Sequence, residues 1–268
     1  MDSLNKNRRT GAKSPLWSKF ASFSKRFLYL MAACMAAMTL AACIEIPADP
    51  DDGGGDNGGD NGGGGGVSGK RIKSWVQETS RPSDYIRVEY TYNSDGSIKQ
   101  VDQYNASGHY TKGIYTNNSD GTTNKIDQSF VTDATMKNVA EFSYSNKILQ
   151  SMKSTLYVNG VATSDLITAY TFVSGKKTLE LSTSSGGAVT IERKFEYDSN
   201  GKRTITTETQ KVNGSTIGTR KFTRSYNADG TLNKVTFPWG PLDPTPVTMT
   251  VTWENGKKAV DEDIYLAL

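Results

Sequence analysis

The sequence predicts an all-β protein, an antiparallel up-and-down meander of about 14 strands that forms one strongly twisted, curved sheet or a partly closed barrel. Three observations predict this fold. Apolar and polar residues alternate with a period of two, seven aromatic residues are each followed by a turn at a mean spacing of about 27, and residues 70–268 lack sustained helical periodicity. Each unit of this length holds one hairpin and a return connection, so seven units give about 14 strands.

Residues 1–42 are predicted to be a signal peptide. The first 26 residues carry seven basic side chains and one acidic one, and the next 16, Phe27–Ala42, carry no charge. A membrane-spanning helix needs about 20 apolar residues. A basic segment, a shorter apolar run and small residues at its end are the pattern of a secretory signal peptide.

The apolar run ends in Leu40-Ala41-Ala42-Cys43, which resembles the lipobox of bacterial lipoproteins. The resemblance implies cleavage after Ala42, a thioether-linked diacylglycerol on Cys43 and acylation of the new amino group. The thiol is the nucleophile that this chemistry requires. An uncleaved signal anchor is one alternative. Cys34 is a second lipidation candidate, but cleavage before it leaves a much shorter apolar run.

The residues after Cys43 indicate the membrane to which the lipoprotein is sorted. In Gram-negative lipoproteins an Asp directly after the lipidated Cys retains the protein in the inner membrane, whereas this chain has Ile44. The resemblance therefore implies the outer membrane. Four acids near Cys43 also resemble signals that send some lipoproteins to the cell surface, namely Glu45, Asp49, Asp51 and Asp52. The expected membrane partner is reached through the lipid on Cys43, because several acyl chains on one residue suffice for stable attachment.

Residues 43–69 are expected to form the lipidated Cys and a disordered Gly/Asp-rich tether. Residues 44–69 hold 11 of the 26 glycines and six acids without one base. Such a segment cannot bury enough apolar surface to offset its conformational entropy, and its r.m.s. reach is about 25–30 Å. A calcium loop is the alternative interpretation, but the Asp-x-Asp-x-Asp-Gly spacing with a distal Glu is missing.

Residues 70–268 are predicted to be a β-meander domain. In residues 85–92 alternate positions are apolar or aromatic on one face and mostly polar on the other. Residues 247–253 repeat this pattern, and residues 191–197 show it less cleanly. Each segment therefore predicts a half-buried strand.

Aromatic residues followed by turn sequences separate the predicted strands. Asp-Gly and Asn-Gly supply the positive φ angles that tight hairpins need. The return connections carry turn sequences too, for example at 105–108 and 213–214. The seven aromatic-turn units begin at Tyr92, Tyr115, Tyr144, Phe172, Tyr197, Tyr226 and Trp253.

Two units, Tyr197-Asp198-Ser199-Asn200-Gly201-Lys202-Arg203 and Tyr226-Asn227-Ala228-Asp229-Gly230-Thr231-Leu232, resemble YD (Rhs-type) repeats, whose core is Tyr-Asp-x-x-Gly-Arg-Leu. The chain also resembles short bacterial outer-membrane lipoproteins of unassigned function that carry degenerate copies of this repeat after a Gly/Asp-rich tether. In long YD proteins the repeats spiral into a shell around a toxic carboxy-terminal domain. Seven units are too few for such a shell, so the resemblance implies the fold and no activity.

No catalytic motif is recognisable, and the sequence predicts a protein that is not an enzyme. The P-loop, Gly-x-Ser-x-Gly and His-Glu-x-x-His motifs are absent. His109, the single histidine, follows a turn and is expected to be a solvated surface residue, because a catalytic base needs a nucleophile and an orienting group. With one His and two Cys, no metal site and no cofactor are predicted. A carboxylate pair for a hydrolase cannot be assigned without the strand register.

Residues 237–246 contain four of the eight prolines and break the strand pattern. They cannot join a central strand, and they place Trp239 on a stiff loop between the last two hairpins. Trp239 is the candidate ligand-binding residue, since a rigid loop can present an aromatic ring to a sugar or a protein. The alternative is that the loop covers an open end of the sheet core with Trp239 turned inward.

These features predict an outer-membrane-anchored lipoprotein whose non-catalytic β-repeat domain binds a glycan or a protein, or has a structural role in the envelope. A carrier of lipid or hydrophobic peptide in a concave sheet is the first alternative, and a hydrolase with an unrecognised carboxylate pair is the second. The full chain has a net charge of +3, divided as +6 for the leader, −6 for the tether and +3 for the β domain. A mildly basic domain on an acidic tether does not predict a nucleic-acid partner.

Overall fold

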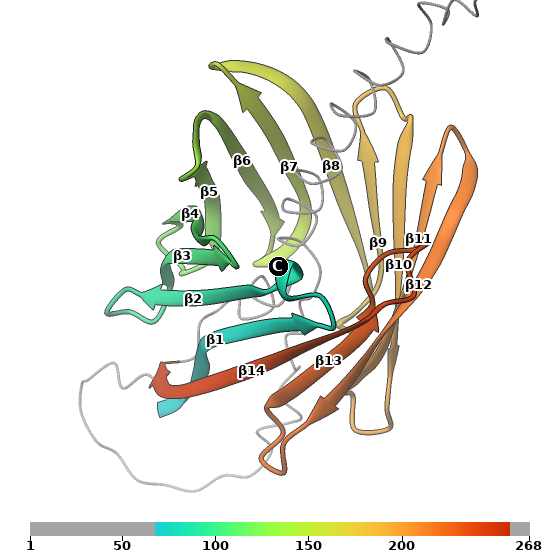
Figure 1. The fold of residues 1–268 in the computed structure, drawn as a ribbon. Helices are drawn as coiled ribbons and strands as arrows, with labels where there is room; N and C mark the ends of the chain where they lie inside the picture. Colours follow the sequence, from blue (N-terminus) through green and yellow to red (C-terminus); the bar gives the residue numbers. More distant parts are fainter. Residues whose placement is uncertain (1–67, 258–268) are drawn as a thin grey trace, which may run out of the picture.

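The computed structural model describes residues 68–257, which form one closed barrel of 14 antiparallel strands (Figure 1). Each strand pairs with its neighbours along the chain, and a short 3-10 helix, η1 (Pro82–Asp84), lies between the first two strands. The strands are β1 (Ser68–Thr79), β2 (Ile86–Tyr92), β3 (Ile98–Asn105), β4 (Gly108–Asn117), β5 (Thr123–Phe130), β6 (Asp133–Ser145), β7 (Ile148–Val158), β8 (Val161–Val173), β9 (Lys176–Ser184), β10 (Val189–Tyr197), β11 (Arg203–Val212), β12 (Ser215–Tyr226), β13 (Leu232–Pro238) and β14 (Pro246–Lys257).

The predicted all-β meander is confirmed, and its sheet closes completely. Closure comes from β1 and β14, which pair over 11 residues of each strand and remove both free edges. Arg71 Nε donates a hydrogen bond to Glu254 Oε1 across this seam at 2.8 Å. The prediction that Trp253 begins a turn is wrong. The ladder with β1 continues to the end of β14 and places Gly256 opposite Gly69, so the strand has no reason to stop at Trp253.

The period of two in the sequence separates an inner from an outer face on each strand. In β5, for example, Ile126 and Gln128 are buried, whereas Lys125 and Asp127, which alternate with them along the strand, are half-exposed. The charged residues Lys125 and Asp127 form an ion pair at 2.9 Å on the outside of the barrel. The inner face therefore forms the core, and the outer face is largely polar.

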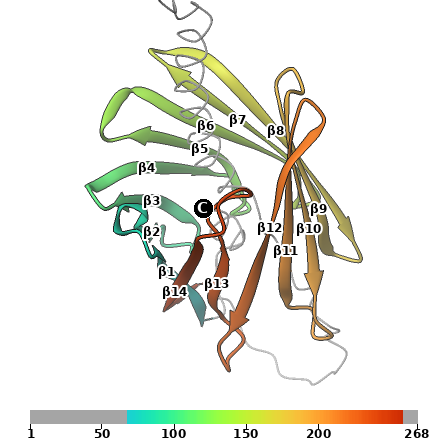
Figure 2. The same ribbon diagram turned by 45° about the vertical axis from the view of Figure 1, so that its right-hand side comes forward.

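The inner face differs from one side of the barrel to the other. Strands β1–β8, β13 and β14 contribute a continuous apolar cluster that includes Ile72, Trp75, Val101 and Met152. Strands β9–β12 contribute mainly charged and polar side chains to the buried inner face. Figures 1 and 2 show β2–β7 and β9–β12 as two walls on opposite sides of the barrel.

The hairpin turns that follow the aromatic residues of the predicted units from Tyr92 to Tyr226 gather at one end of the barrel, which we call the proximal rim and define as the end that carries Ser68 and Lys257. In the turn after β2, Asp95 Oδ1 accepts a hydrogen bond from the Ser97 N–H at 2.8 Å, and Gly96 has φ 95°. An aspartate before a glycine thus fixes the turn by binding the backbone two residues later. The opposite end of the barrel is the distal rim.

The tyrosines of the predicted units join neighbouring strands at the proximal rim. Tyr92 Oη donates to the Ile72 carbonyl at 2.5 Å, and Tyr226 Oη donates to the Arg203 carbonyl at 2.6 Å. Tyr197 Oη does the same to the Lys177 carbonyl, at 2.5 Å. Each phenol therefore reaches back to the start of the preceding strand and ties the ends of two strands together.

The residue after the turn glycine completes this repeated arrangement. Lys202 Nζ lies 5.4 Å from the centre of the Tyr226 ring, and Lys176 Nζ lies 5.3 Å from that of Tyr197. Gly201 has φ 79°, and a Cβ atom there would come within 2.8 Å of Lys176 Nζ. In the units that begin at Phe172 and Tyr197, the lysine after the turn glycine thus packs against the tyrosine of the next unit.

Candidate functional site

The inner face of β9–β12 carries a row of alternating charges. Glu180, Arg193, Glu208 and Arg220 lie on four successive strands, and each is the register partner of the next. Arg193 binds both carboxylates, through Nη1 to Glu180 and through Nε to Glu208 Oε2 at 2.8 Å. Arg220 Nε donates to Glu208 Oε1 at 2.7 Å. Both glutamates are fully buried, so the row is an ion-pair network within the core.

The two guanidinium groups keep Glu208 ionised. Burial on its own raises the pKa of a carboxyl group, but the charges and hydrogen bonds of Arg193 and Arg220 outweigh burial and lower the pKa of Glu208 to about 2 from an ordinary 4.5. A carboxyl group with such a pKa carries no proton near neutral pH. Glu208 is therefore unsuited to act as a general acid, whose pKa must be raised.

Three more cations lie on the same inner face, towards the proximal rim. Lys177 Nζ lies 4.9 Å and Arg203 Cζ 4.7 Å from the centre of the Phe195 ring. Arg224 Nη1 donates to Thr206 Oγ1 at 2.7 Å. Lys177 Nζ also lies 3.5 Å from Glu180 Oε2, at the end of the charged row. Among the described residues, the inner face of β9–β12 thus holds five cations and two carboxylates, namely Lys177, Arg193, Arg203, Arg220, Arg224, Glu180 and Glu208.

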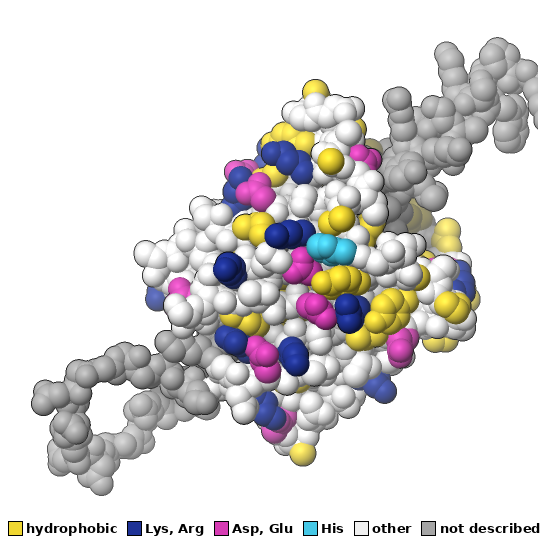
Figure 3. All heavy atoms as spheres, turned by 60° about the vertical axis from the view of Figure 1, so that its left-hand side comes forward, with side chains coloured by type: hydrophobic (Ala, Val, Ile, Leu, Met, Phe, Trp, Pro, Cys, Tyr) yellow, Lys and Arg dark blue, Asp and Glu magenta, His cyan; other side chains and the backbone are white. Residues whose placement is uncertain are grey.

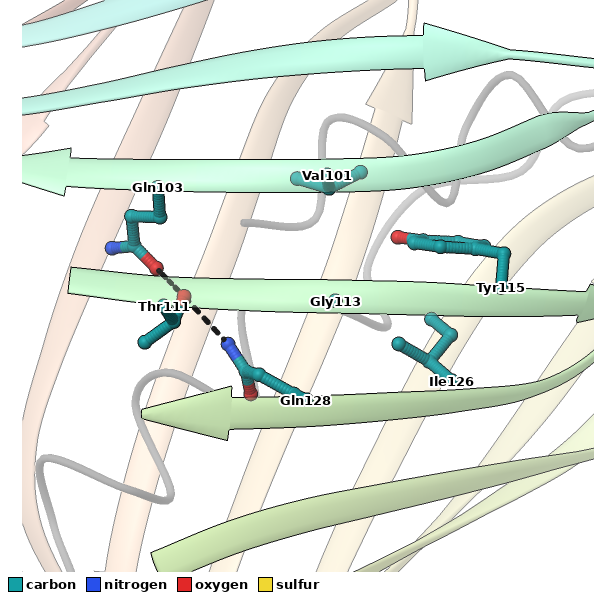
Figure 4. Close-up of a pocket in the computed structure, with 7 residues that line it drawn as sticks. All are labelled: Val101, Gln103, Thr111, Gly113, Tyr115, Ile126 and Gln128. Atoms are coloured by element: carbon teal, nitrogen blue, oxygen red, sulfur yellow. Dashed lines mark hydrogen bonds between the residues drawn. The ribbon is translucent and has the colours of Figure 1, made fainter. Parts of the chain in front are cut away.

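A small pocket lies on the inner face of β3, β4 and β5 (Figure 4). Thr111 closes one side of the pocket with two hydrogen bonds. Its Oγ1 donates to Gln103 Oε1 at 3.1 Å and accepts from Gln128 Nε2 at 3.2 Å. Gly113 lies at the middle, where a Cβ atom would be in ordinary van der Waals contact with Ile126 Cγ2 at 3.5 Å. The remaining lining residues are Val101, Tyr115 and Ile126.

The pocket and the charged row lie on opposite walls. In a closed ring of 14 strands, β4 and β11 are seven strands apart in either direction, so their inner faces look towards each other. Figures 1 and 2 show the same opposition between the green strands and the orange strands. The inside of the barrel is therefore apolar on one side and cationic on the other.

Trp239, predicted as a ligand-binding residue, lies in the β13–β14 connection at the distal rim. The Trp239 N–H donates to the Thr245 carbonyl at 2.8 Å, which closes the loop on itself. Arg81 Nη2 binds Asp243 Oδ2 at 2.9 Å, and the Arg81 guanidinium lies 5.6 Å from the centre of the Trp239 ring. Leu242, at the tip of the loop, is 80% exposed.

The same loop also lies over the inner face of β12 near the distal rim. Arg220 Nη1 donates to the Trp239 carbonyl at 2.9 Å, so the charged row ends at this loop. A Cβ atom on Gly218 would come within 2.5 Å of Pro241, and only a glycine accommodates this approach. The prediction that residues 237–246 cannot join a central strand needs a correction at both ends of the segment, where Phe237 pairs with Val247 as part of β13. Pro238 and Pro246 end β13 and begin β14 opposite each other, because strand ends tolerate a missing N–H.

His109 lies on the outer face, near the start of β4, as Figure 3 shows in cyan. His109 Nε2 lies 3.1 Å from Asp102 Oδ1 and 3.0 Å from the Thr111 carbonyl oxygen, and its ring stacks on Tyr104 with 5.0 Å between ring centres. Lysines, arginines and acids are interspersed with a few hydrophobic side chains over this face (Figure 3). Hydroxyl or thiol nucleophiles with a base beside them are not found among these contacts, so the cluster does not assemble a catalytic triad.

The remaining predicted site residue, Cys43, lies outside the described residues, as do Cys34 and the predicted tether. Residues 68–257 contain no cluster of three or more His, Cys, Asp or Glu that could hold a metal ion. The same range contains no helix long and apolar enough to span a membrane.

Comparison with known proteins finds similarity in fold only. No protein-family profile and no curated protein sequence matches this chain. A porin-like protein from Bacteroides vulgatus aligns with a TM-score of 0.47 and 8% identity over 69% of this chain and 99% of that one. A porin-like protein from Bacteroides uniformis gives a TM-score of 0.41 and 11% identity over 68% and 98%. The TcdB2-TccC3-TEV structure gives 0.25 and 14% over 61% of this chain and 10% of that chain.

The charged row was not predicted from the sequence, although one signal for it is visible there. In residues 191–197 the pattern is less clean because Arg193 occupies the same face as Ile191 and Phe195. A charge on the apolar face of a strand requires a partner inside the core. The partners Glu180 and Glu208 lie on other strands, and only the register identifies them.

Proposed function

We propose that the protein is a lipoprotein anchored to the outer membrane of a Gram-negative bacterium through Cys43, and that its barrel binds a ligand on the inner face without catalysis. The observation that carries the binding role is the division of the inner face into an apolar wall with a pocket and a cationic wall opposite to it.

A non-catalytic role is favoured over the hydrolase alternative by the carboxylates of the core. A glycosidase needs one carboxyl group with a raised pKa and a second one free to attack or to activate water. In this barrel Glu180 and Glu208 both bind Arg193, and the pKa of Glu208 is lowered to about 2. Glu208 therefore cannot serve as the proton donor of such a pair.

The outer face supports attachment by a lipid, with the barrel outside the hydrocarbon layer. A barrel that crosses a membrane with its strands shows lipids an apolar band about 25 Å tall. Here charged pairs lie on the outer face well inside the strands, with Lys194 3.0 Å from Glu192 on β10 and Lys153 3.3 Å from Asp165 between β7 and β8. Such ion pairs are stable in water and costly in lipid.

The anchor is tested by labelling cells that produce the full chain with an alkyne fatty acid. We expect label on the wild type and on Cys34→Ser, and none on Cys43→Ser. If Cys43→Ser keeps the label and Cys34→Ser loses it, Cys34 is the lipidated residue. Label on neither wild type nor variants would refute the lipid anchor altogether.

The binding role is tested by native mass spectrometry of the full-length protein released from its membranes. We expect a bound mass that disappears on denaturation, and equal occupancy in Lys221→Gln, a control on the outer face of β12. A protein that carries only its own lipid, and that binds nothing in glycan, lipid and peptide screens, would refute the binding role. Turnover of the ligand during incubation would favour the hydrolase alternative.

A second candidate, binding of a glycan or protein partner at the distal rim, is favoured by the 80% exposure of Leu242 beside Trp239. A protein partner would cover this side chain, since exposed apolar residues on rigid loops are common contact points. Trp239→Ala and Leu242→Ser should each reduce capture of such a partner on glycan arrays or in pull-downs. Unchanged capture by both variants would exclude this loop as the binding site of the partner.

A further inference from the structure

We infer that the open edge of β12 near the distal rim is a docking site for an extended peptide segment of a partner protein. The segment would add to the sheet as one more antiparallel strand, with an acidic residue opposite Lys221. This edge lies outside the inner face of the barrel, so the inference goes beyond the proposed ligand and does not depend on it.

β12 is longer than the strand beside it. It pairs with β11 from its start to Thr223, but with β13 only over its last four residues, Thr223–Tyr226. The register brings Pro238, the last residue of β13, opposite Lys221, and a proline has no N–H to donate to the ladder. Residues Ser215–Arg220 therefore extend past β13 by about 20 Å, at ~3.3 Å per residue. Figures 1 and 2 show the β11–β12 hairpin reaching beyond the end of β13.

Alternate residues of β12 direct their backbone groups to this open edge. The Asn227 N–H donates to the Thr231 carbonyl across the β12–β13 hairpin at 2.8 Å, and successive residues of a strand point in opposite directions. Thr219 and Lys221 therefore direct their N–H and C=O groups away from β11, whereas the even-numbered residues between them bond to β11. Within residues 68–257, no turn or loop residue forms a backbone hydrogen bond with Thr219. Backbone groups that are open in this geometry pair with another extended chain.

The β13–β14 loop supports the projecting part of β12 from the inside. Arg220 Nη1 donates to the Trp239 carbonyl at 2.9 Å, and Pro241 packs so close to Gly218 that a Cβ atom there would lie 2.5 Å from it. An isolated hairpin is only marginally stable in water, so this support keeps the edge in place. A preformed edge costs a partner less conformational entropy on binding.

The outer face of this edge indicates what the peptide carries. Thr219 and Lys221 are both exposed there. Residues directly opposite each other on neighbouring strands are in contact, and pairs of β-branched residues or of opposite charges stabilise the pairing. A matching strand therefore has a β-branched residue opposite Thr219 and an acid opposite Lys221. A lysine in an open edge also disfavours pairing between two copies of the same chain, which favours a different protein as the partner.

The test uses the full-length protein in phosphatidylcholine nanodiscs and a fluorescent peptide, Thr-Val-Glu-Val-Thr-Val-Thr. The comparison probes are the same peptide with Lys in place of Glu, and one whose alternate amides facing β12 are N-methylated. By fluorescence anisotropy we expect the Glu peptide to bind about fivefold more tightly than the Lys peptide. It should bind about tenfold more tightly than the N-methylated peptide, which cannot donate to the edge.

Two variants and one exchange measurement locate the peptide. Thr219→Pro removes the N–H that faces the edge and should weaken binding about tenfold, with Thr219→Ala as a matched control that keeps this N–H. Lys221→Glu should reverse the preference between the Glu and Lys peptides, and it serves even if the proline variant fails to fold. In the protein without peptide, the Thr219 amide should exchange its hydrogen about tenfold faster than the Arg220 amide, and binding of the peptide should slow it.

Equal protection of the Thr219 and Arg220 amides without peptide would overturn the inference, because the edge would then be covered. Absence of binding by the Glu peptide, or unchanged binding in both variants, would overturn it too. Loss of binding in Leu242→Ser alone would place the peptide on the β13–β14 loop instead. A dimer that Thr219→Pro abolishes would make a second copy the occupant and overturn the partner peptide. All of these results leave the inner-face ligand standing, since native mass spectrometry tests it separately.

Discussion

Replacing Arg193 with methionine should destabilise the barrel by about 3–5 kcal/mol, the usual cost of removing one partner from a buried ion pair. Arg193 is 5% exposed and binds two carboxylates that are themselves fully buried. The variant keeps Arg220 beside Glu208 but leaves Glu180 with Lys177 alone, at 3.5 Å. The loss therefore comes from two buried carboxylates that each keep only one of their two counter-charges.

The pKa of Glu208 gives an independent estimate of this magnitude. Its folded value of about 2 lies below the ordinary 4.5, and at 1.36 kcal/mol per pKa unit the ionised form contributes about 3 kcal/mol to stability. Because the folded pKa is lowered, this contribution is fully present above about pH 4.5 and is lost as the pH falls towards about 2. The two estimates agree in size.

The assay is urea unfolding of the full-length protein in detergent, followed by tryptophan fluorescence, at pH 7 and at a series of lower values. We expect the difference between wild type and Arg193→Met to be largest at pH 7 and to shrink below about pH 4.5. Adding Glu180→Gln to Arg193→Met should recover part of the loss, because an amide costs less to bury than a carboxylate. A loss under about 1 kcal/mol at pH 7 would refute the electrostatic reasoning, and so would a difference that is independent of pH.

Three further changes test the proximal rim and the seam of the barrel. Tyr226→Phe removes the hydrogen bond to the Arg203 carbonyl and should cost about 1 kcal/mol by urea unfolding; no change would show that the phenol contributes only packing. Gly201→Ala should lower the free energy of unfolding by about 1–2 kcal/mol, because Gly201 has φ 79°. Gly113→Ala, in the middle of a strand, should leave the stability unchanged. Equal losses of stability in the two variants would contradict this reasoning. Glu254→Lys places two cations across the seam and should lower the thermal midpoint more at low salt than at high salt, and a salt-independent change would refute an electrostatic effect.

The sequence contains most of the information about local strand order. Tyr197 and Tyr226 each precede a turn with a glycine of positive φ, and these turns form where they were predicted because they depend on residues within one hairpin. Trp253 was assigned to the same class on its Glu-Asn-Gly sequence, but β1 lies beside it and extends the strand. A turn propensity is overruled when a partner strand offers ladder hydrogen bonds to the same residues.

The candidate site could not be predicted in the same way. Arg193 stands on the apolar face of its strand, which is visible in the sequence, but its partners lie 13 and 15 residues away on two neighbouring strands. Gly113 likewise gives no local signal for a pocket, since the space beside it depends on Val101 and Ile126 from adjacent strands. Both features arise from register, and shifting a strand by one residue would turn each of these side chains to the outside.

Closure of the barrel is the step on which the site depends. Every ladder except one joins strands that are consecutive in the chain and whose register is set by the turn between them. The β1–β14 ladder joins residues about 180 positions apart, so its register must come from side chains at the seam, where Ile72 faces Trp253 and Arg71 faces Glu254. Without this ladder the sheet would keep its hairpins but could open, and the apolar wall would no longer be held opposite the cationic wall. Loss of the seam should therefore abolish ligand binding before it abolishes strand content.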